Sequence, residues 1–234
     1  VFAFQACLEP GDEVIIPEPF YANYNGFATM AGVKVVPVAS SIEEGFALPP
    51  VEDIAAKVTS RTRAILICNP GNPTGYVYTD EELAAIRTLV LEHDLYLFAD
   101  EVYREFCYGD KPPTSVLSLE GLDEHVVLMD SVSKRYSACG ARMGWLVTRN
   151  SEVREAALRF GQARLSPATV DQYATQAALT VPESWFKEVI AEYQARRNLL
   201  VKGLRNIGLD VTMPQGAFYL AIPLPVEDAS EFCR

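Results

Sequence analysis

Residues 63–103 decide the fold class and read RAILICNPGNPTGYVYTDEELAAIRTLVLEHDLYLFADEVY. The short apolar runs at 64–67 and 95–99 are typical of buried strands. Between them, T-D-E-E places Glu82 three residues after the capping residue Thr79, which predicts a helix that continues to about His93. A strand, a helix and a second strand form a βαβ unit, and such units favour a parallel sheet covered by helices.

The same alternation continues in both directions along the chain. Four more apolar runs predict buried strands at 14–16, 33–38, 126–129 and 143–147. The expected fold class is therefore α/β, a three-layer α/β/α arrangement with a mainly parallel sheet. From about Ser151 the pattern becomes mostly helical, and one further strand is expected at 217–222. We predict a large domain at 1–190 and the beginning of a small C-terminal α+β domain at 191–234.

Composition excludes several classes of protein. With 49% hydrophobic and 22% charged residues, the 234-residue chain resembles an ordinary globular protein. A formal net charge of -11 repels phosphate backbones, which opposes nucleic-acid binding. No apolar stretch approaches the ~20 residues of a membrane span, and the first residues lack a signal-peptide layout, so we expect a cytoplasmic protein. The five cysteines show no CxxC spacing, so neither a metal site nor a disulfide framework is predicted.

Polar clusters follow three successive predicted strands. NPGNPTG occupies 69–75, DEVY occupies 100–103 and SVSK occupies 131–134. In parallel α/β sheets the ligand binds outside the carboxyl ends of the strands, so these clusters are expected to converge. An unrelated nucleotide-binding domain is disfavoured, because neither GxGxxG nor GxxxxGK[ST] occurs.

Lys134 is the first candidate for chemistry. Read alone, it is a solvated surface lysine, but Ser131 and Ser133 precede it and Arg142 follows in GARMGW. A phosphate can be bound by such a set of groups: hydroxyls, a forked guanidinium, and backbone N–H groups that glycines allow to approach. A lysine beside such a phosphate site suggests a phosphorylated aldehyde as its partner.

Asp100 is the second candidate. Four apolar residues precede it, so its carboxylate is expected to be partly buried and to need a cationic partner, such as a protonated pyridine nitrogen. The alternatives are a helix cap or a salt bridge with Arg104. Glu101 is expected to point away. Asn72 read alone is a turn residue, and Tyr103 read alone is a packing aromatic.

NPGNPTG, DEVY and SVSKRYSACGARMGW, in this order and spacing, strongly resemble the signature of class I and II aminotransferases, the fold-type-I pyridoxal-phosphate (PLP) enzymes. The resemblance includes PGDEVIIPEPFYANY at 10–24 and PQGAFYLAIP at 214–223. The sequence as a whole is similar to the aspartate aminotransferase branch. The SxSKxxxxxGxRxG portion is highly specific, whereas NPTG or DEVY alone would be weak.

The resemblance implies pyridoxal 5'-phosphate as cofactor, with Lys134 forming the Schiff base and Asp100 keeping the pyridine nitrogen protonated. Asn72 and Tyr103 would hydrogen-bond the phenolic oxygen, which makes Lys134, Asp100 and Tyr103 the catalytic candidates. Tyr21, in PFYANY, would stack on the cofactor ring; its alternative role is that of a core tyrosine. The phosphate would be bound by Ser131, Ser133 and Arg142.

The resemblance implies transfer of an amino group from an amino acid to a 2-oxo acid, with an aspartate-like donor favoured. It also implies a role in amino acid metabolism and a homodimer. Carbon–sulfur lyases and aminocyclopropane-carboxylate synthases share these motifs, and a non-catalytic regulatory domain is another alternative. By the same resemblance the chain is expected to be a piece of a longer protein. A phosphate-binding loop would precede Val1 and a carboxylate-binding arginine would follow Arg234, so we expect this piece to be weak or inactive in catalysis.

Overall fold

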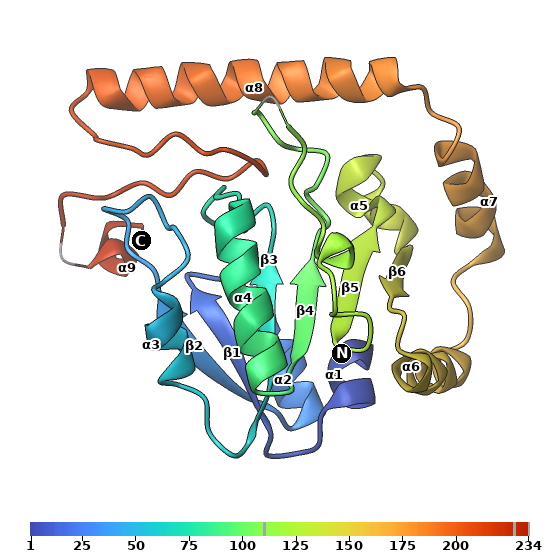
Figure 1. Cartoon of the computed structure of the whole chain (residues 1–234). Helices are drawn as coiled ribbons and strands as arrows, with labels where there is room; N and C mark the ends of the chain where they lie inside the picture. Colours follow the sequence, from blue (N-terminus) through green and yellow to red (C-terminus); the bar gives the residue numbers. More distant parts are fainter. Residues whose placement is uncertain (110, 227, 234) are drawn as a thin grey trace.

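The computed structural model describes residues 1–109, 111–226 and 228–233. A six-stranded sheet in the order β2-β1-β3-β4-β5-β6 lies between two layers of helices, as Figure 1 shows. The first five strands are parallel and β6 is antiparallel to β5. This confirms the predicted α/β class with its mainly parallel sheet. The strands are β1 (Glu13–Glu18), β2 (Lys34–Ala39), β3 (Thr62–Cys68), β4 (Tyr96–Asp100), β5 (Val126–Ser131) and β6 (Gly144–Val147).

The helices connect the strands and then form a long run after β6. Their order agrees with the change of pattern expected near Ser151. The helices are α1 (Phe2–Cys7), α2 (Asn23–Ala31), α3 (Val51–Ala55), α4 (Asp80–Glu92), α5 (Val132–Arg135), α6 (Ser151–Arg164), α7 (Thr169–Ala178), α8 (Glu183–Asn206) and α9 (Ala229–Phe232), with 3-10 turns η1 (Val116–Ser118) and η2 (Cys139–Ala141).

Helix α4 begins at the capping box that the sequence predicted. The Thr79 side chain accepts a hydrogen bond from the backbone N–H of Glu82, and the Glu82 carboxylate accepts one from the backbone N–H of Thr79. Glu82 also accepts hydrogen bonds from the Tyr76 hydroxyl at 3.0 Å and from the Leu48 backbone N–H at 2.8 Å. The cap therefore also ties α4 to the segment between β2 and α3 and to the loop after β3.

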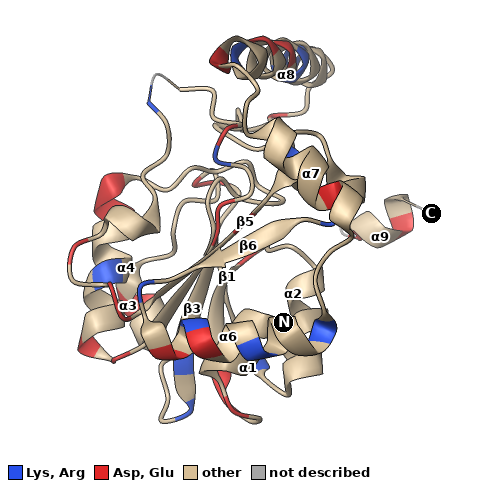
Figure 2. Cartoon of the chain, turned by 90° about the vertical axis from the view of Figure 1, so that its right-hand side faces the viewer, with Lys and Arg blue, Asp and Glu red and all other residues tan. Residues whose placement is uncertain are grey.

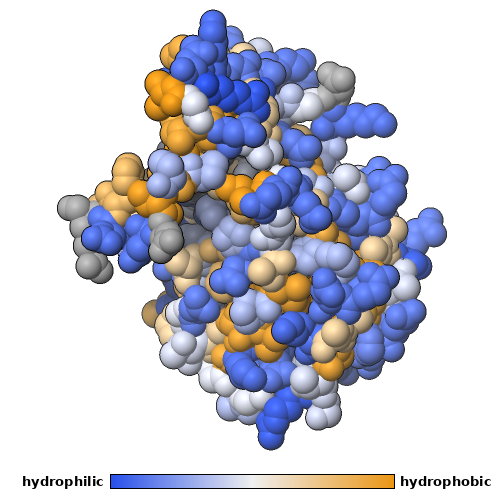
Figure 3. Space-filling view, turned by 90° about the vertical axis from the view of Figure 1, so that its left-hand side faces the viewer, coloured by the Kyte–Doolittle hydropathy of each residue, from blue (hydrophilic) through white to orange (hydrophobic). Residues whose placement is uncertain are grey.

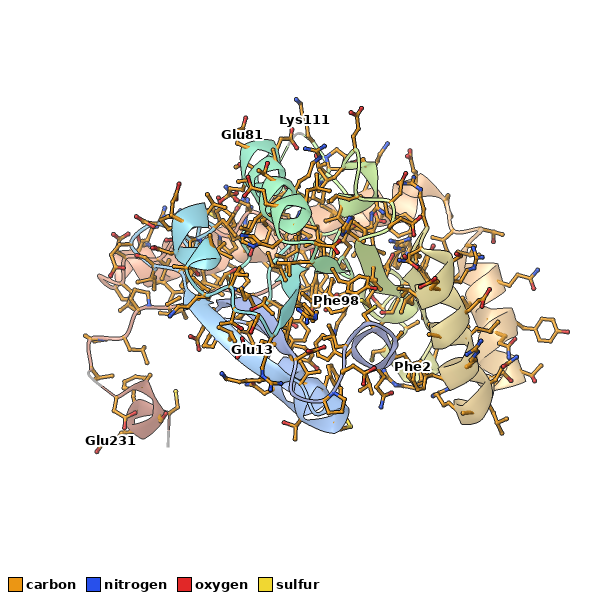
Figure 4. The ribbon with its side chains drawn as sticks, turned by 60° about the horizontal axis from the view of Figure 1, so that its bottom comes forward. Phe2, Glu13, Glu81, Phe98, Lys111 and Glu231 are labelled. Carbon is orange, nitrogen blue, oxygen red and sulfur yellow. The ribbon has the colours of Figure 1, made fainter. Side chains whose placement is uncertain are left out.

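Alternate residues of each strand pack on opposite faces of the sheet. Ile15 and Leu97 face the layer that contains α3 and α4. Leu66 and Phe98 face the layer that contains α1, α2 and α6. Figure 4 shows Phe98 inside the molecule, whereas Glu81 projects outward from α4. Successive side chains of each strand point to opposite faces, so the apolar runs fill two separate cores and the sheet is covered on both faces.

The strand predicted at 217–222 is wrong. Residues 217 and 218 form a turn, residues 219–222 form no regular structure, and the nearest ladder contact is an isolated bridge between Cys107 and Gly216. The backbone N–H of Ala217 donates to the carbonyl of Phe106 at 2.8 Å, so this segment packs on a loop. A strand exists only where a neighbouring strand accepts its hydrogen bonds, and within the described residues this segment has no such neighbour.

Helix α8 lies across the end of the sheet where the parallel strands finish, as Figure 1 shows. It continues without a break through residue 190, where the predicted large domain ends. The division into 1–190 and 191–234 therefore stays a prediction, and its boundary falls inside one helix.

The molecular surface is mixed in charge and mostly polar. Both α6 and α8 carry acidic and basic residues in Figure 2, and hydrophilic residues cover most of the face in Figure 3, with scattered apolar patches. None of the helices in the described part of the chain is both long enough and apolar enough to span a membrane. Over the same residues, no group of three or more His, Cys, Asp or Glu side chains is placed to hold a metal ion.

Candidate active site

The predicted site residues gather at one edge of the sheet because of strand direction. The parallel strands β3, β4 and β5 all finish at this edge, with Asp100 as the last residue of β4 and Ser131 as the last of β5. Strand β6 runs the opposite way and starts there, which brings Arg142 to the same edge. The chain order of the strands also reverses between β1 and β3, the position at which α/β sheets open a ligand crevice.

Asp100 pairs across the sheet with Cys68 of β3 and Met129 of β5. Its carboxylate accepts hydrogen bonds from the Tyr24 hydroxyl at 2.7 Å and from the Val102 backbone N–H at 3.3 Å. Burial raises the pKa of Asp100, while these two hydrogen bonds and the positive charge of Lys134 act in the opposite direction. The predicted burial is confirmed.

The alternative salt bridge between Asp100 and Arg104 is wrong. A guanidinium nitrogen of Arg104 lies 3.9 Å from a carboxylate oxygen of Glu101. Glu101 points away from Asp100, as predicted, and accepts hydrogen bonds from the Ser115 hydroxyl at 3.0 Å and the Val116 backbone N–H at 2.9 Å. Across the described residues, no Lys, Arg or His nitrogen lies within 4.0 Å of the Asp100 carboxylate.

Lys134 lies in the single turn of α5, directly after β5. Ser131 caps this turn by accepting a hydrogen bond from the Ser133 backbone N–H at 3.2 Å. The Lys134 amino nitrogen lies 5.8 Å from the ring centres of both Tyr103 and Phe218. Lys134 is half-buried against two aromatic rings that pack on each other, so its reading as a solvated surface lysine is wrong.

Tyr103 and Asn72 come from the loops that follow β4 and β3. The buried Tyr103 ring has its hydroxyl 2.7 Å from the Tyr219 hydroxyl, and burial followed by this hydrogen bond raises the pKa of Tyr103. Asn72, in the loop after β3, lines a small cavity together with Tyr24 and Cys68. Tyr103 thus contacts the lysine, and Asn72 lies near the tyrosine that bonds Asp100.

A larger cavity of about 590 Å³ opens beside Asp100 and is also lined by Arg142. Arg142 is exposed, has a left-handed backbone with φ 51°, and donates to the Cys139 carbonyl at 2.8 Å. Gly144 lets β6 approach β5 at this edge, because a Cβ there would lie 2.9 Å from the Asp130 carbonyl oxygen. The volume is within the range of small-molecule sites, which is about 300–1,000 Å³.

Tyr21 is exposed, so its alternative role as a core tyrosine is wrong. Its ring lies edge-on to that of Tyr24, with 5.5 Å between the ring centres, and its hydroxyl accepts a hydrogen bond from Asn23 at 2.7 Å. A chain of contacts therefore runs from Tyr21 through Tyr24 to Asp100.

Sequence reasoning missed two residues that touch the candidate site, Tyr24 and Tyr219. Tyr24 is in the quoted stretch PFYANY and Tyr219 is in GAFY, but neither carried a role. Tyr24 lies in the first turn of α2, whereas Tyr21 precedes the N-cap Ala22, so helical spacing gave no signal that pairs the two rings. Tyr219 offered no signal either, because its partner Tyr103 is 116 residues away.

Comparison with known proteins shows the family to which the chain belongs. The family model described as aminotransferase class I and II matches residues 1–234. The aspartate/prephenate aminotransferase of Thermus thermophilus is 38% identical over 93% of the chain, and aromatic-amino-acid aminotransferase 2 of Thermococcus litoralis is 38% identical over 91%. The chain therefore belongs to the class I and II aminotransferase family.

Solved structures show the same similarity in three dimensions. A Thermus thermophilus aspartate aminotransferase double mutant superposes with a TM-score of 0.88 at 36% identity, over 94% of this chain and 58% of the other. N-succinyldiaminopimelate aminotransferase of Mycobacterium tuberculosis gives a TM-score of 0.91 at 30% identity, over 99% and 61%. The chain spans 56% and 55% of the lengths of the Thermus thermophilus and Thermococcus litoralis relatives.

Proposed function

We propose that the protein transfers an amino group from an amino acid to a 2-oxo acid, with pyridoxal 5'-phosphate attached to Lys134 as its cofactor. The observation that carries this proposal is the buried Asp100 carboxylate, which has no basic side chain within ion-pair distance in the described ranges and lines the same cavity as Arg142. A buried carboxylate is costly unless a cation reaches it. The protonated pyridine nitrogen of the cofactor would be that cation, so the residues fit this group.

Each of the predicted residues then has a binding role. Asp100 would hold the proton on the pyridine nitrogen, and Arg142, with Ser131 and Ser133, would bind the phosphate. The Ser131 oxygen accepts the cap hydrogen bond, and its own O–H remains a donor. Tyr103 and Asn72 would bind the phenolic oxygen, and the exposed Tyr21 ring would cover the ring of the cofactor.

When bound, pyridoxal phosphate supplies an electron sink that stabilises negative charge at the substrate α-carbon. Lys134 would remove the α-proton and return it to the carbon that comes from the aldehyde of the cofactor, acting as general base and then as general acid. The rings of Tyr103 and Phe218 face this amino group from one side, each with its centre 5.8 Å away. Tyr103, whose raised pKa keeps the hydroxyl protonated, would remain a hydrogen-bond donor through the reaction.

The test is an absorbance spectrum of the purified protein with added pyridoxal phosphate, before and after borohydride reduction, followed by mass mapping of the modified lysine. We expect a visible band that reduction removes, with the adduct on Lys134. Lys134→Ala should abolish both signals, whereas Lys187→Ala, which changes an exposed lysine of α8, should leave them unchanged. No adduct, or an adduct on another lysine only, contradicts the proposed function.

For the substrate, we propose an aspartate-like amino donor. Support comes from the curated relatives, of which several are named aspartate or aspartate/prephenate aminotransferases and one an aromatic-amino-acid aminotransferase. The test is amino transfer from aspartate, tyrosine and alanine to 2-oxoglutarate, measured in parallel. Faster transfer from tyrosine contradicts the aspartate preference, and ammonia release from a cysteine conjugate would instead indicate a carbon–sulfur lyase.

We also propose a homodimer in the cytoplasm. Large apolar side chains are exposed around α7, which favours burial of this region against another surface. All five cysteines are free thiols, as expected in a reducing compartment. Sedimentation equilibrium measures the mass, and a monomer at micromolar concentration contradicts the dimer. The exposed apolar residues are Leu165, Val170, Tyr173 and Leu179.

A further inference from the structure

Three charged side chains surround the turn that carries Lys134, and none of them has a role in the proposed chemistry. Asp130 is the residue before the helix cap and is buried at the end of β5. Arg135 directly follows Lys134 and is largely buried, and its guanidinium donates to the Asp130 carboxylate. Its Nε atom lies 3.2 Å from a carboxylate oxygen of Glu105, in the loop after β4.

Arg135 therefore joins three parts of the candidate site. It contacts β5 through Asp130 and the loop that carries Tyr103 through Glu105. It also contacts β6, because its guanidinium lies 5.8 Å from the ring centre of Trp145. A second interaction holds the start of the turn, since the Asp130 carboxylate accepts a hydrogen bond from the backbone N–H of Ser131 at 2.7 Å.

The turn itself is too short to hold its own shape. Helix α5 has four residues, and a helix of one turn is not stable in water without tertiary contacts. The direction in which Lys134 points must therefore be fixed by its neighbours. Val132 anchors the buried side of the turn, and its backbone N–H donates to the Met143 carbonyl at 3.2 Å. At the end of the turn, Arg135 pairs with Asp130 and Glu105, and the C-cap residue Tyr136 packs on the rings of Trp185 and Phe186.

The ion pair is a poor source of stability, which favours a positional role. Burial raises the pKa of Asp130, and the charge of Arg135 acts against this with help from the backbone N–H of Ser131 and the charge of Arg104. Buried ion pairs of this kind give little net stability compared with apolar residues, but they fix geometry. Two further carboxylates face the group: Glu105 adds repulsion at Asp130, and Asp130 in turn repels Glu101.

We propose that Asp130 and Arg135 form a clamp that positions the Lys134 amino group where it faces the packed rings of Tyr103 and Phe218. Both are positioning residues, because they act through Lys134. This inference rests on the proposed function, which gives Lys134 its chemical role. The position of the Lys134 amino group can nevertheless be measured in the cofactor-free protein.

The test is competitive acylation of the cofactor-free protein with limiting acetic anhydride, in which mass spectrometry compares Lys134 with the exposed Lys187. The double variant Asp130→Asn with Arg135→Gln removes both charges together, so no uncompensated charge stays buried. Local opening should raise the labelling of Lys134 relative to Lys187 by about fivefold or more. The matched control is Arg149→Gln, which breaks an exposed pair with Asp123 and should leave the ratio within about twofold.

Arg135→Lys serves as a second, milder variant. It keeps the charge but loses the forked geometry that reaches both carboxylates, so the labelling ratio should rise to an intermediate value. Reduced pyridoxal phosphate adduct on Lys134 should fall in the same order across the variants. If the double variant unfolds, the result for Arg135→Lys alone decides.

A labelling ratio that stays at its original value in a folded double variant, or in Arg135→Lys, overturns the inference, whatever happens to thermal stability. The proposed function fails separately, if the unsubstituted protein forms no adduct on Lys134. The two failures are distinguishable because acylation needs no cofactor.

Discussion

Replacing Tyr24 with phenylalanine removes one hydroxyl from the buried end of β4 and keeps the ring. That hydroxyl donates to Asp100 at 2.7 Å, and Tyr24 is almost fully buried, so no solvent replaces it freely. A hydrogen bond to a charged group contributes about 1.5–3 kcal/mol. We expect Tyr24→Phe to lower the free energy of unfolding of the cofactor-free protein by this amount at neutral pH.

The loss of stability in Tyr24→Phe should depend on pH, and the ionisation of Asp100 determines whether it grows or shrinks as pH falls. Burial raises the folded-state pKa of Asp100 above its ordinary value of 3.8, and the Tyr24 hydrogen bond opposes that rise. Without the hydroxyl the pKa rises further, because the ionised form loses a donor. The variant is therefore least stable, relative to the unsubstituted protein, where Asp100 is ionised. The difference in free energy of unfolding shrinks as pH falls through the folded-state pKa of Asp100.

Urea unfolding of both proteins at neutral pH and near pH 3.8 measures this difference. The matched control is Tyr96→Phe, because Tyr96 begins the strand that Asp100 ends, about 13 Å away at 3.3 Å per residue. The control should change stability by no more than about 0.5 kcal/mol at either pH. Equal stability of Tyr24→Phe and the unsubstituted protein, or a loss of the same size at both pH values, would refute the reasoning.

Three further predictions follow from contacts in the fold. Gly144→Ala places a Cβ 2.9 Å from the Asp130 carbonyl oxygen and should cost about 1–3 kcal/mol in urea unfolding, whereas Gly140→Ala, which has open space, should not. Thr79→Ala removes the cap of α4 and should lower the unfolding free energy by about 1 kcal/mol; an unchanged value would deny the capping box a role. Hydrogen bonds from Thr59 and Lys34 lower the pKa of Glu13, so its stabilisation is present above pH 4.5 and is lost as pH falls through the folded-state pKa. Glu13→Gln should therefore lose about 1 kcal/mol at neutral pH and converge with the unsubstituted protein in acid, as a pH series of thermal melts would show.

Local sequence determined the elements and their order. Continuous apolar runs marked all six strands, because successive residues of a strand covered on both faces enter opposite cores. The capping box at Thr79 fixed the start of α4, since both of its hydrogen bonds form within four residues. The polar residues after β3, β4 and β5 could be assigned to one edge for a similar reason: parallel strands end on the same side.

Partners distant in the chain were decided only by the tertiary structure. The antiparallel direction of β6, which brings Arg142 to the edge where Asp100 ends β4, follows from how β6 packs beside β5. The Tyr24 hydroxyl reaches Asp100 across 76 positions, and Tyr103 meets Tyr219 across 116. The predicted strand at 217–222 failed for the same reason. Periodicity reports which side of an element is buried, but the neighbour that satisfies each polar group is chosen when the elements pack together.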